Sequence, residues 1–556
     1  MIWEPELEDP QISQIHRNRE AVLGMTVDIF IRGGRVFDGG GGPPVEADIA
    51  IQGERIIGAG RDVSSPAAHR VIDARGLAVC PGFVDIHGHS DYHLLLTPTA
   101  ESAVLQGVTS EIGGNCGFAA APIWGPWWED RAKSYRDVYG LDHEWHDVAA
   151  YFRRLMDVGI SINFGLLIGH NTLRGSAMGG ADRAPRPVEM EEMVAALERG
   201  MGEGALGLST GLVYSPACFS PPEELATLTA VAGRRGGVLA THMRSEGDGL
   251  LEAIREVIAA AEAARTPLQI SHLKTYGERN WGKLTQAFEL IESAQRRGVD
   301  VTADRYPYTA ANTGLQAALP RWALEGSKAE QTARLGDPTV RSRIRQEIGE
   351  GPNARDWSQV MISEVTQPEN RRYQGLRVDA AARVAGKETL PFVLDLLQEE
   401  QTQVDAIYFT MSEENLQAIL RKPYVMIGSD SGCRAHYGPL STGRPHPRTF
   451  GSFARVLGHY SREARLFDLS TAIRKMTSDA CRRMGLADRG WIRQGNAADI
   501  VLFDPDRIRD TATYEEPIRY PAGVHMVLVN GTVAAEAGAY TGARAGRILR
   551  RPAATS

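Results

Sequence analysis

The feature that most constrains the fold is an alternation of short apolar segments with longer amphipathic ones between residues 83 and 431. The apolar segments have the length and composition of buried strands, and the segments between them repeat apolar residues with the period of a helix. Strands that alternate with helices predict a parallel sheet, and eight of them predict an α/β protein with a (β/α)8, TIM-like barrel. The eight strands are expected at residues 83–89, 108–117, 161–170, 204–212, 236–243, 268–274, 298–308 and 424–431.

Both ends of the chain have a different, β-rich pattern. Residues 26–80 contain short apolar runs closed by glycine turns, and residues 486–545 return to that pattern. We expect the two to pair in one small β-sandwich module, which leaves residues 81–485 for the barrel. Residues 310–405 are too long for a simple loop between the last two strands, so we expect a largely helical insertion that acts as a lid over the barrel mouth. Residues 1–25 are expected to be an N-terminal extension.

Charge and cysteine content exclude several classes of partner. The 556 residues include 61 lysines and arginines against 69 aspartates and glutamates, a net charge of −8 that gives no electrostatic reason to expect nucleic acid or an anionic membrane. The five cysteines are scattered, which is typical of a reducing compartment. No apolar stretch is long enough to span a membrane, and the acidic start does not resemble a signal peptide. We therefore expect a cytoplasmic protein, and leave its oligomeric state open, a homo-oligomer included.

Residue types that bind metals follow five of the eight predicted strands. Because the carboxyl ends of barrel strands meet at one mouth, these side chains are expected to converge. His87 and His89 alternate along a strand, so both are expected to point inward. Imidazole and thiolate together favour zinc, although any one of these residues alone would more often belong to the core. The candidate ligands are His87, His89, Cys116, His242, His272 and Asp430.

A series of motifs resembles one family in both content and order. The motifs are PGFVDIHGHSD (81–91), GGNCGFAAAP (113–122), STGLVYSP (209–216), ATHMRSEGDG (240–249), SHLKTYGERNWGK (271–283), DRYPYTAANTGL (304–315), MIGSDS (426–431) and HPRTFGSFARVLG (446–458). Together they resemble the D-aminoacylases, or N-acyl-D-amino-acid deacylases, of the amidohydrolase superfamily. The resemblance covers about residues 26–540 and implies a zinc-dependent hydrolase that cleaves linear N-acyl-D-amino acids.

The resemblance also implies roles for the metal-type residues. Cys116, His242 and His272 would hold one tightly bound zinc ion. His87 and His89 would form a neighbouring, weakly occupied site that the Cys116 thiolate bridges. We therefore expect one tight zinc and a second, weak site.

The remaining roles that the resemblance implies are catalysis and substrate binding. Asp430 would be the general base and acid. Tyr214, Lys274 and Arg448 would bind the substrate carboxylate. Lys274 is expected on the same strand face as His272, and Arg448 in the loop that leaves the strand of Asp430.

Two alternative functions stay open at this point. One is a cyclic amidase of the same superfamily, which opens hydantoin, imide or lactam rings. Many such members use a lysine on strand four to bridge two metals, and residues 204–216 contain no lysine, which counts against this alternative. The other is a non-catalytic scaffold, which is disfavoured because every metal and acid position is filled.

One loop departs from the pattern of the family. Residues 428–448 are longer than usual and add Cys433, Arg434, His436 and Arg444 near the substrate end. We expect this loop to be solvated. If its cations pointed inward instead, they would favour an acidic acyl-amino acid.

Overall fold

A parallel barrel forms the centre of the molecule. In residues 26–61, 63, 67–349 and 355–551, which the computed structural model describes, eight parallel strands follow one another in a single sheet in the order β16-β12-β11-β10-β9-β8-β7-β6. Their bounds are β6 Phe83–Asp85, β7 Val108–Gly113, β8 Asn163–Gly169, β9 Gly207–Gly211, β10 Val238–His242, β11 Leu268–Ile270, β12 Val301–Arg305 and β16 Val425–Ile427. The barrel expected from the alternating pattern is confirmed, whereas the expected N-terminal extension lies outside the described residues.

The first and last strands meet just beyond their ends. Gly88 forms a parallel bridge with Ser431, and the Asp430 amide donates to the His87 carbonyl over 2.7 Å. Because the sheet closes at this seam, two of the expected metal-type segments are joined by the backbone itself.

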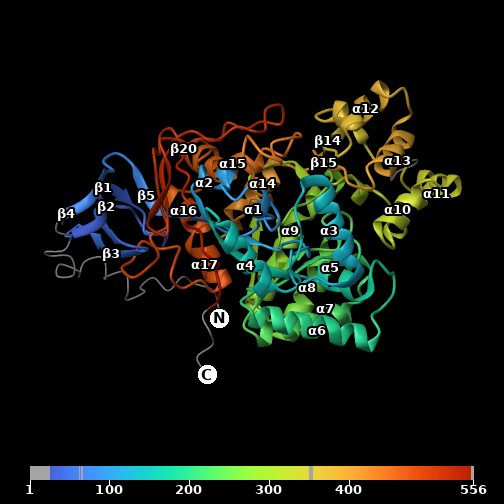
Figure 1. Ribbon diagram of the computed structural model, residues 1–556, viewed down its shortest axis with the longest axis horizontal. Coiled ribbons are helices and arrows are strands. Elements are labelled where there is room, and N and C mark those ends of the chain that lie inside the picture. The colour runs from blue at the N-terminus through green and yellow to red at the C-terminus, as the bar shows by residue number, and fades with distance from the viewer. Residues whose placement is uncertain (1–25, 62, 64–66, 350–354, 552–556) are drawn as a thin grey trace.

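Helices surround the barrel and follow its strands along the chain (Figure 1). Amphipathic helices such as α8 bury their apolar faces against the strands, as the helical period predicted. The bounds are α1 His93–Leu96, α2 Glu101–Val104, α3 Gly125–Tyr139, α4 Val148–Val158, α5 His170–Met178, α6 Pro187–Gly202, α7 Pro222–Arg234, α8 Leu250–Ala264, α9 Leu284–Arg296, α14 Glu413–Arg421, α15 Arg448–Arg455, α16 Leu469–Met476 and α17 Ser478–Met484.

The barrel interior is packed with side chains, so it is a solid support for whatever lies at its mouth. One buried cluster contains Val84, Ile112 and Leu167 together with Val238 and Met426. These residues come from strands on different sides of the barrel, so their shared cluster fills the interior. Residues of α17 belong to the same cluster and close one end of the barrel.

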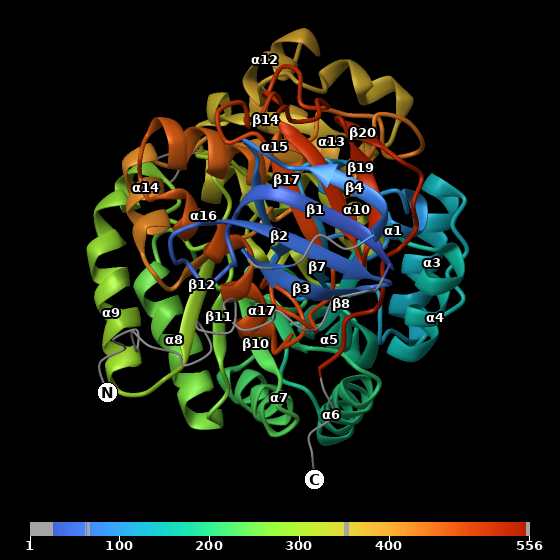
Figure 2. The same ribbon diagram turned by 90° about the vertical axis from the view of Figure 1, so that its left-hand side faces the viewer.

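Strands from both ends of the chain share a second sheet. Its order is β20-β19-β18-β17-β5-β1-β2-β3, with β4 paired to β1, and β17 joins the two chain ends by antiparallel pairing with β5. Figure 2 shows β1, β2 and β3 in front of the barrel. The bounds are β1 Thr26–Val36, β2 Val45–Gln52, β3 Arg55–Gly60, β4 Ala67–Asp73, β5 Ala78–Pro81, β17 Ile500–Phe503, β18 Val524–Val529, β19 Thr532–Glu536 and β20 Ala539–Tyr540.

The insertion between β12 and β16 has strands as well as helices. The strands β13 Ala311–Gly314, β15 Asp405–Tyr408 and β14 Val360–Glu364 form an antiparallel sheet with its own buried core. The expectation of a largely helical insertion therefore missed this sheet, because its strands are short and separated by long stretches of chain. Its helices are α10 Lys328–Leu335, α11 Pro338–Ile344, α12 Val378–Val384 and α13 Thr389–Glu399 (Figure 1).

No helix in the described part of the chain is both long and apolar enough to cross a membrane.

Candidate functional site

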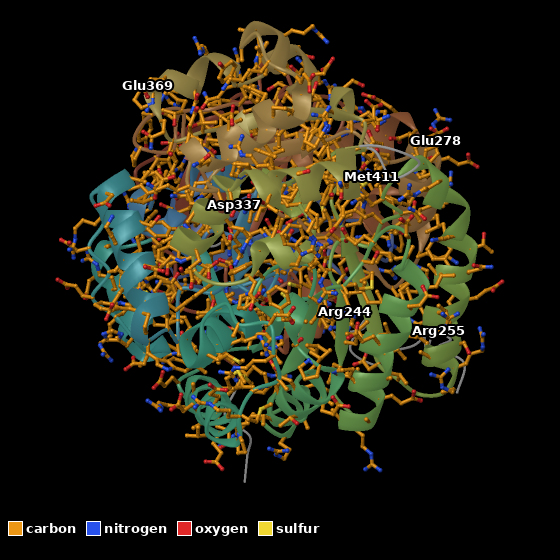
Figure 3. The ribbon with its side chains drawn as sticks, turned by 90° about the vertical axis from the view of Figure 1, so that its right-hand side faces the viewer. Arg244, Arg255, Glu278, Asp337, Glu369 and Met411 are labelled. Atoms are coloured by element: carbon orange, nitrogen blue, oxygen red, sulfur yellow. The ribbon has the colours of Figure 1, made fainter. Side chains whose placement is uncertain are left out.

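A cleft of about 1390 Å³ lies at the carboxyl ends of the barrel strands, where the barrel loops face the insertion. Its lining includes His89, Cys116, Asp430 and residues of β13 and β15. Figure 3 views the side of the molecule opposite the β-rich module and labels Arg244 and Glu278, which both line the cleft. The cleft therefore contains the strand-end residues that the sequence singled out.

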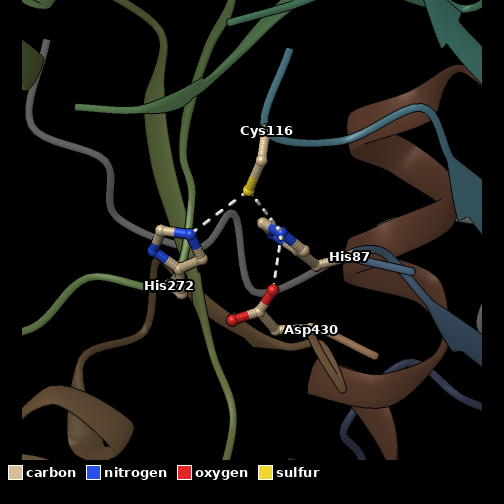
Figure 4. Close-up of side chains that lie close together, drawn as sticks. All are labelled: His87, Cys116, His272 and Asp430. Atoms are coloured by element: carbon tan, nitrogen blue, oxygen red, sulfur yellow. Dashed lines mark hydrogen bonds and ion pairs between the residues drawn. The ribbon is translucent and has the colours of Figure 1, made fainter. Parts of the chain in front are cut away.

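Cys116 is the centre of the metal-type cluster (Figure 4). Its Sγ lies 3.4 Å from His87 Nε2 and 3.4 Å from His272 Nε2. A third ring nitrogen, His242 Nδ1, lies 3.7 Å from the same sulfur. Three imidazoles converge on one thiol, which has at most one proton to share among them.

The distances in this cluster fit a tetrahedral zinc ion. Zinc–sulfur and zinc–nitrogen bonds of about 2.3 and about 2.0 Å at tetrahedral angles separate the two donors by about 3.5 Å. The measured separations of Cys116 Sγ from His242 and His272 are 3.7 and 3.4 Å. The donor set of one sulfur and two nitrogens is also one that zinc prefers.

The backbone is unusual at three residues of the cluster. Cys116, His272 and Asp430 have φ angles of 53°, 38° and 54°, in the left-handed region that residues other than glycine seldom occupy. Such conformations cost on the order of 1–3 kcal/mol each and concentrate at functional sites. Each of the three follows the end of a barrel strand, so the turn directs its side chain into the mouth.

These turns correct two expectations about strand length. β7 ends at Gly113 and β11 at Ile270, so Cys116 and His272 follow the strands instead of lying within them. The argument that places Lys274 on the same strand face as His272 is therefore wrong. The two side chains nevertheless meet, with Lys274 Nζ 2.8 Å from His272 Nδ1.

Asp430 connects the metal-type cluster to a cation. One carboxylate oxygen lies 3.0 Å from His89 Nε2 and 3.4 Å from His87 Nε2, and the other accepts a hydrogen bond from Arg448 Nη1 over 2.7 Å. Burial raises the pKa of the Asp430 carboxyl, but Arg448 and then His272 hold that pKa well below its usual range. Asp430 is therefore ionised and able to accept a proton.

A buried carboxylate behind His87 fixes the orientation of its ring. Asp304, at the end of β12, lies 3.0 Å from His87 Nδ1 and also accepts from the His272 amide over 2.8 Å. When Nδ1–H donates to a carboxylate, Nε2 is left unprotonated and able to bind a metal. Here Nε2 is the atom that faces Cys116.

Glu246 performs the same task for two other histidines. Its oxygens lie 2.8 Å from His272 Nδ1 and 3.5 Å from His242 Nε2, in each case the nitrogen that faces away from Cys116. Lys274 Nζ donates to the same carboxylate over 2.5 Å. Glu246 thus holds two imidazoles in the tautomer and orientation that a shared metal requires.

We expect Glu246→Gln to weaken zinc binding by roughly 10- to 100-fold, the usual effect of removing a carboxylate that orients a metal-binding histidine. The amide keeps the shape of the side chain but is a weaker acceptor for two imidazole N–H groups. Competition with a chromogenic chelator measures the affinity. Glu256→Gln is the matched control, because Glu256, a residue of α8, forms an ion pair with Arg244 and has no contact with the histidines. Equal zinc affinity in the two variants would remove Glu246 from this role.

The three expected substrate-binding residues surround the cluster. Lys274 is buried and forms an ion pair with Glu246. Arg448 is the first residue of α15, and its guanidinium donates a hydrogen bond to Asp430. The Tyr214 hydroxyl lies 2.9 Å from the Thr313 hydroxyl, and its ring centroid lies 4.8 Å from that of His242. The structure therefore brings together the tyrosine, the lysine and the arginine around one part of the cleft.

Tyr306 is a further residue that sequence reasoning missed. Its ring lies beneath both cations, with Arg448 Cζ 4.7 Å and Lys274 Nζ 5.8 Å from the ring centroid. Its buried hydroxyl has no hydrogen-bond partner among the described residues, and the residue lines the cleft. Asp304 and Tyr306 lie at the carboxyl end of β12, Val301–Arg305, so the rule that located the candidate ligands also points to these two residues.

The loop 428–448 is only partly solvated, which corrects the expectation. Cys433 and Arg434 are buried, whereas His436 and Arg444 are exposed. Arg434 reaches into the cleft, but Glu364 of β14 accepts from it through both oxygens, over 3.1 and 2.6 Å. The inward cation is therefore neutralised within the protein.

The barrel and the histidine–cysteine–aspartate cluster at its mouth define the class as a TIM-like barrel hydrolase of the metal-dependent type. A profile of the amidohydrolase family matches residues 70–535, so the chain belongs to that family. It is 35% identical to a D-aminoacylase from Alcaligenes xylosoxydans xylosoxydans, over 95% of this chain and 98% of that one. It is 36% identical to an N-acyl-D-glutamate deacylase from the same organism, over 95% of this chain and 97% of that one. Among solved structures, the N-acyl-D-glutamate deacylase from Bordetella bronchiseptica, in complex with zinc and a phosphonate inhibitor, matches with a TM-score of 0.81 and 32% identity, covering 95% of this chain and all of that one.

Proposed function

We propose that the protein is a zinc-dependent deacylase, which hydrolyses the amide bond of N-acyl-D-amino acids to a carboxylate and a D-amino acid. The observation that carries this proposal is the contact between Arg448 and Asp430, because it sets a cation for a substrate carboxylate beside the metal-type cluster. The activities named for the two relatives at about 35% identity support the same conclusion.

Cys116, His242 and His272 are the proposed ligands of the tight zinc ion, and His87 with His89 the proposed weak site. Zinc, when bound, supplies Lewis-acid activation of water and of the amide carbonyl. The strand β9, Gly207–Gly211, has no lysine that could bridge two metals, so Cys116 is the proposed bridging anion.

Asp430 is the proposed general base and acid. In this role it takes a proton from the attacking water and then delivers that proton to the nitrogen of the leaving amine. Burial raises the pKa of this carboxyl, but the neighbouring Arg448 lowers it by more. The carboxylate is therefore ionised before the attack. Its 3.0 Å contact with His89 Nε2 orients the same oxygen toward the cluster.

Arg448, Lys274 and Tyr214 are the proposed clamp for the α-carboxylate, with Tyr306 as a hydroxyl donor beneath it. Arg448 has N–H groups to spare after its bond to Asp430, since a guanidinium has five donors. When the α-carboxylate and the scissile amide are both held in place, only one enantiomer of the substrate directs its side chain into the open cleft. The D preference is proposed from the relatives, whose names specify it.

We expect Arg448→Met to lower kcat/KM for N-acetyl-D-amino acids by roughly ten- to a hundred-fold, because a hydrogen bond to a charged group contributes about 1.5–3 kcal/mol. The matching N-acetyl-D-amino amides have no carboxylate, so they should lose less, and only through the missing contact between Arg448 and Asp430. Kinetics of both substrates with the wild type and the variant measure the difference.

Arg444→Met is the matched control for this experiment. Arg444 lies in the same loop but is exposed and donates to the Glu515 carbonyl. It should leave both substrates unaffected. Equal losses on acid and amide in Arg448→Met would show that Arg448 acts through Asp430 alone and would remove it from the carboxylate clamp.

The insertion is proposed as a cover for the cleft during the reaction. Supporting this, the Ser134 hydroxyl of α3 lies 3.3 Å from Gln403 at the edge of the insertion, so the two sides already meet. A cytoplasmic location is also proposed, since all five cysteines are free and buried. A homo-oligomer remains a proposal that awaits a measurement of mass in solution.

A further inference from the structure

The insertion brings one carboxylate into the part of the cleft that faces the carboxylate clamp. Asp405 is the first residue of β15, lines the cleft, and pairs in register with Gly314 of β13. Two residues earlier on β13, the Asn312 carbonyl accepts from Arg448 Nη2 over 3.4 Å. Asp405 therefore lies about two strand residues, or roughly 7 Å along the strand, from the proposed site of the α-carboxylate.

This position belongs to the amino-acid half of a substrate. The contacts run in order from the metal-type cluster to Asp430, from Asp430 to Arg448, and from Arg448 to Asn312. The scissile carbonyl would lie at the cluster end of this series and the α-carboxylate at Arg448. A group that extends past Arg448 toward Asp405 is then the side chain of the amino acid and not the acyl group.

Asp405 has no partner of its own. Among the described residues no hydrogen bond or ion pair involves its side chain, and it is exposed to the cleft. The protein atoms that form the cleft around it partly desolvate its carboxyl, and together with the nearby Glu364 they raise its pKa to about 6.

Two cations near Asp405, Arg434 and Arg448, are already engaged. Arg434 is bound through both terminal nitrogens to Glu364. Arg448 is bound to Asp430 and would also receive the substrate carboxylate. Of the carboxylates of Glu364, Asp430 and Asp405, only that of Asp405 is thus left without an ion pair among the described residues.

Two neutral acceptors lie near the same carboxylate. Asn312 Oδ1 and Gln316 Oε1 are buried, have no hydrogen-bond partner, and belong to residues that line the cleft. The Gln316 side chain packs against Gly314, the residue paired with Asp405. A carboxylate with two free amide oxygens fits a group with several N–H donors and a positive charge.

We propose that Asp405 selects N-acyl-D-amino acids with a long cationic side chain, of the lysine or arginine type, over neutral and acidic ones. This inference rests on the proposed deacylase function and adds the substrate class. The cations of the loop 428–448 suggested acidic substrates instead. They do not act in that way, because Glu364 neutralises Arg434 and Arg444 does not line the cleft.

The test compares N-acetyl-D-arginine with N-acetyl-D-citrulline, which has nearly the same shape without the charge. For the wild type, kcat/KM should be roughly ten- to a hundred-fold higher for the arginine compound, the range expected of a charge-assisted hydrogen bond. N-acetyl-D-glutamate should be the poorest substrate. In Asp405→Asn the arginine-to-citrulline ratio should fall toward one, while kcat/KM for citrulline changes little.

Glu278→Gln is the matched control, because it removes one carboxylate from the rim of the same cleft (Figure 3). It should leave the ratio unchanged, which separates a local contact from general attraction of cations. An arginine-to-citrulline ratio near one in the wild type, or a ratio that Asp405→Asn does not alter, would overturn the inference. Turnover of N-acetyl-D-citrulline would still support the proposed deacylase function. Failure of the wild type to hydrolyse any of the three compounds and N-acetyl-D-methionine would overturn the proposed function, and the inference with it.

Discussion

Cys116→Ala should lose its tightly bound zinc and, with it, nearly all hydrolysis. Three imidazoles approach Cys116 Sγ within 3.4–3.7 Å, and removal of this sulfur leaves the proposed tight site with two nitrogens. A two-ligand site cannot complete the four-coordinate arrangement that zinc favours in proteins. Metal analysis of the purified variant measures the effect directly and does not depend on any substrate.

Cys433→Ala provides the control. Cys433 is also buried and unpaired, but its sulfur faces the Thr97 carbonyl and belongs to no metal-type group among the described residues, so both substitutions remove one sulfur from a packed interior. Cys433→Ala should keep a full equivalent of zinc and its activity. A full equivalent of zinc in Cys116→Ala would show that the metal is held elsewhere.

The second large effect is expected for Asp430→Asn, which should keep the fold and the zinc but lower kcat by about 10²–10⁴-fold. Asparagine has nearly the same shape and can still accept from Arg448, but its amide cannot take a proton from water. Because Arg448 and His272 keep Asp430 ionised despite its burial, the substitution removes the base in the state that the reaction needs. Steady-state kinetics with metal analysis of the same sample separates catalysis from zinc binding.

Asp510→Asn is a matched control for this variant. Asp510 pairs with Arg455 over 3.1 Å at a similar exposure, so the substitution weakens a comparable ion pair away from the cluster. Its kcat should be near that of the wild type. A near-normal kcat in Asp430→Asn would identify another residue as the base.

The position of the metal-type residues could be predicted from the sequence for a topological reason. In a parallel barrel every strand delivers its carboxyl end to the same mouth, so a histidine or cysteine just past a strand is placed by the fold. His87, Cys116 and His272 follow their strands closely and His242 is the last residue of β10, so the rule holds despite the error in strand length at β7 and β11.

Residues whose role depends on loop geometry could not be assigned in this way. Glu246 and Asp248 both follow β10, and only the fold of that loop shows that Glu246 turns back to the histidines while Asp248 pairs with Arg279. Asp405 is placed by the pairing of β15 with β13, nearly a hundred residues earlier in the chain. A short strand of four residues has too little periodicity to reveal such a pairing.

The central claim is that the protein hydrolyses the amide bond of N-acyl-D-amino acids, and hydrolysis of N-acetyl-D-methionine against N-acetyl-L-methionine by the zinc-loaded protein tests it most directly. We predict release of free methionine from the D compound with kcat/KM at least about tenfold above that of the L compound, a difference of about 1.4 kcal/mol in transition-state binding. Preference for the L compound, or no release of methionine from either, would contradict it.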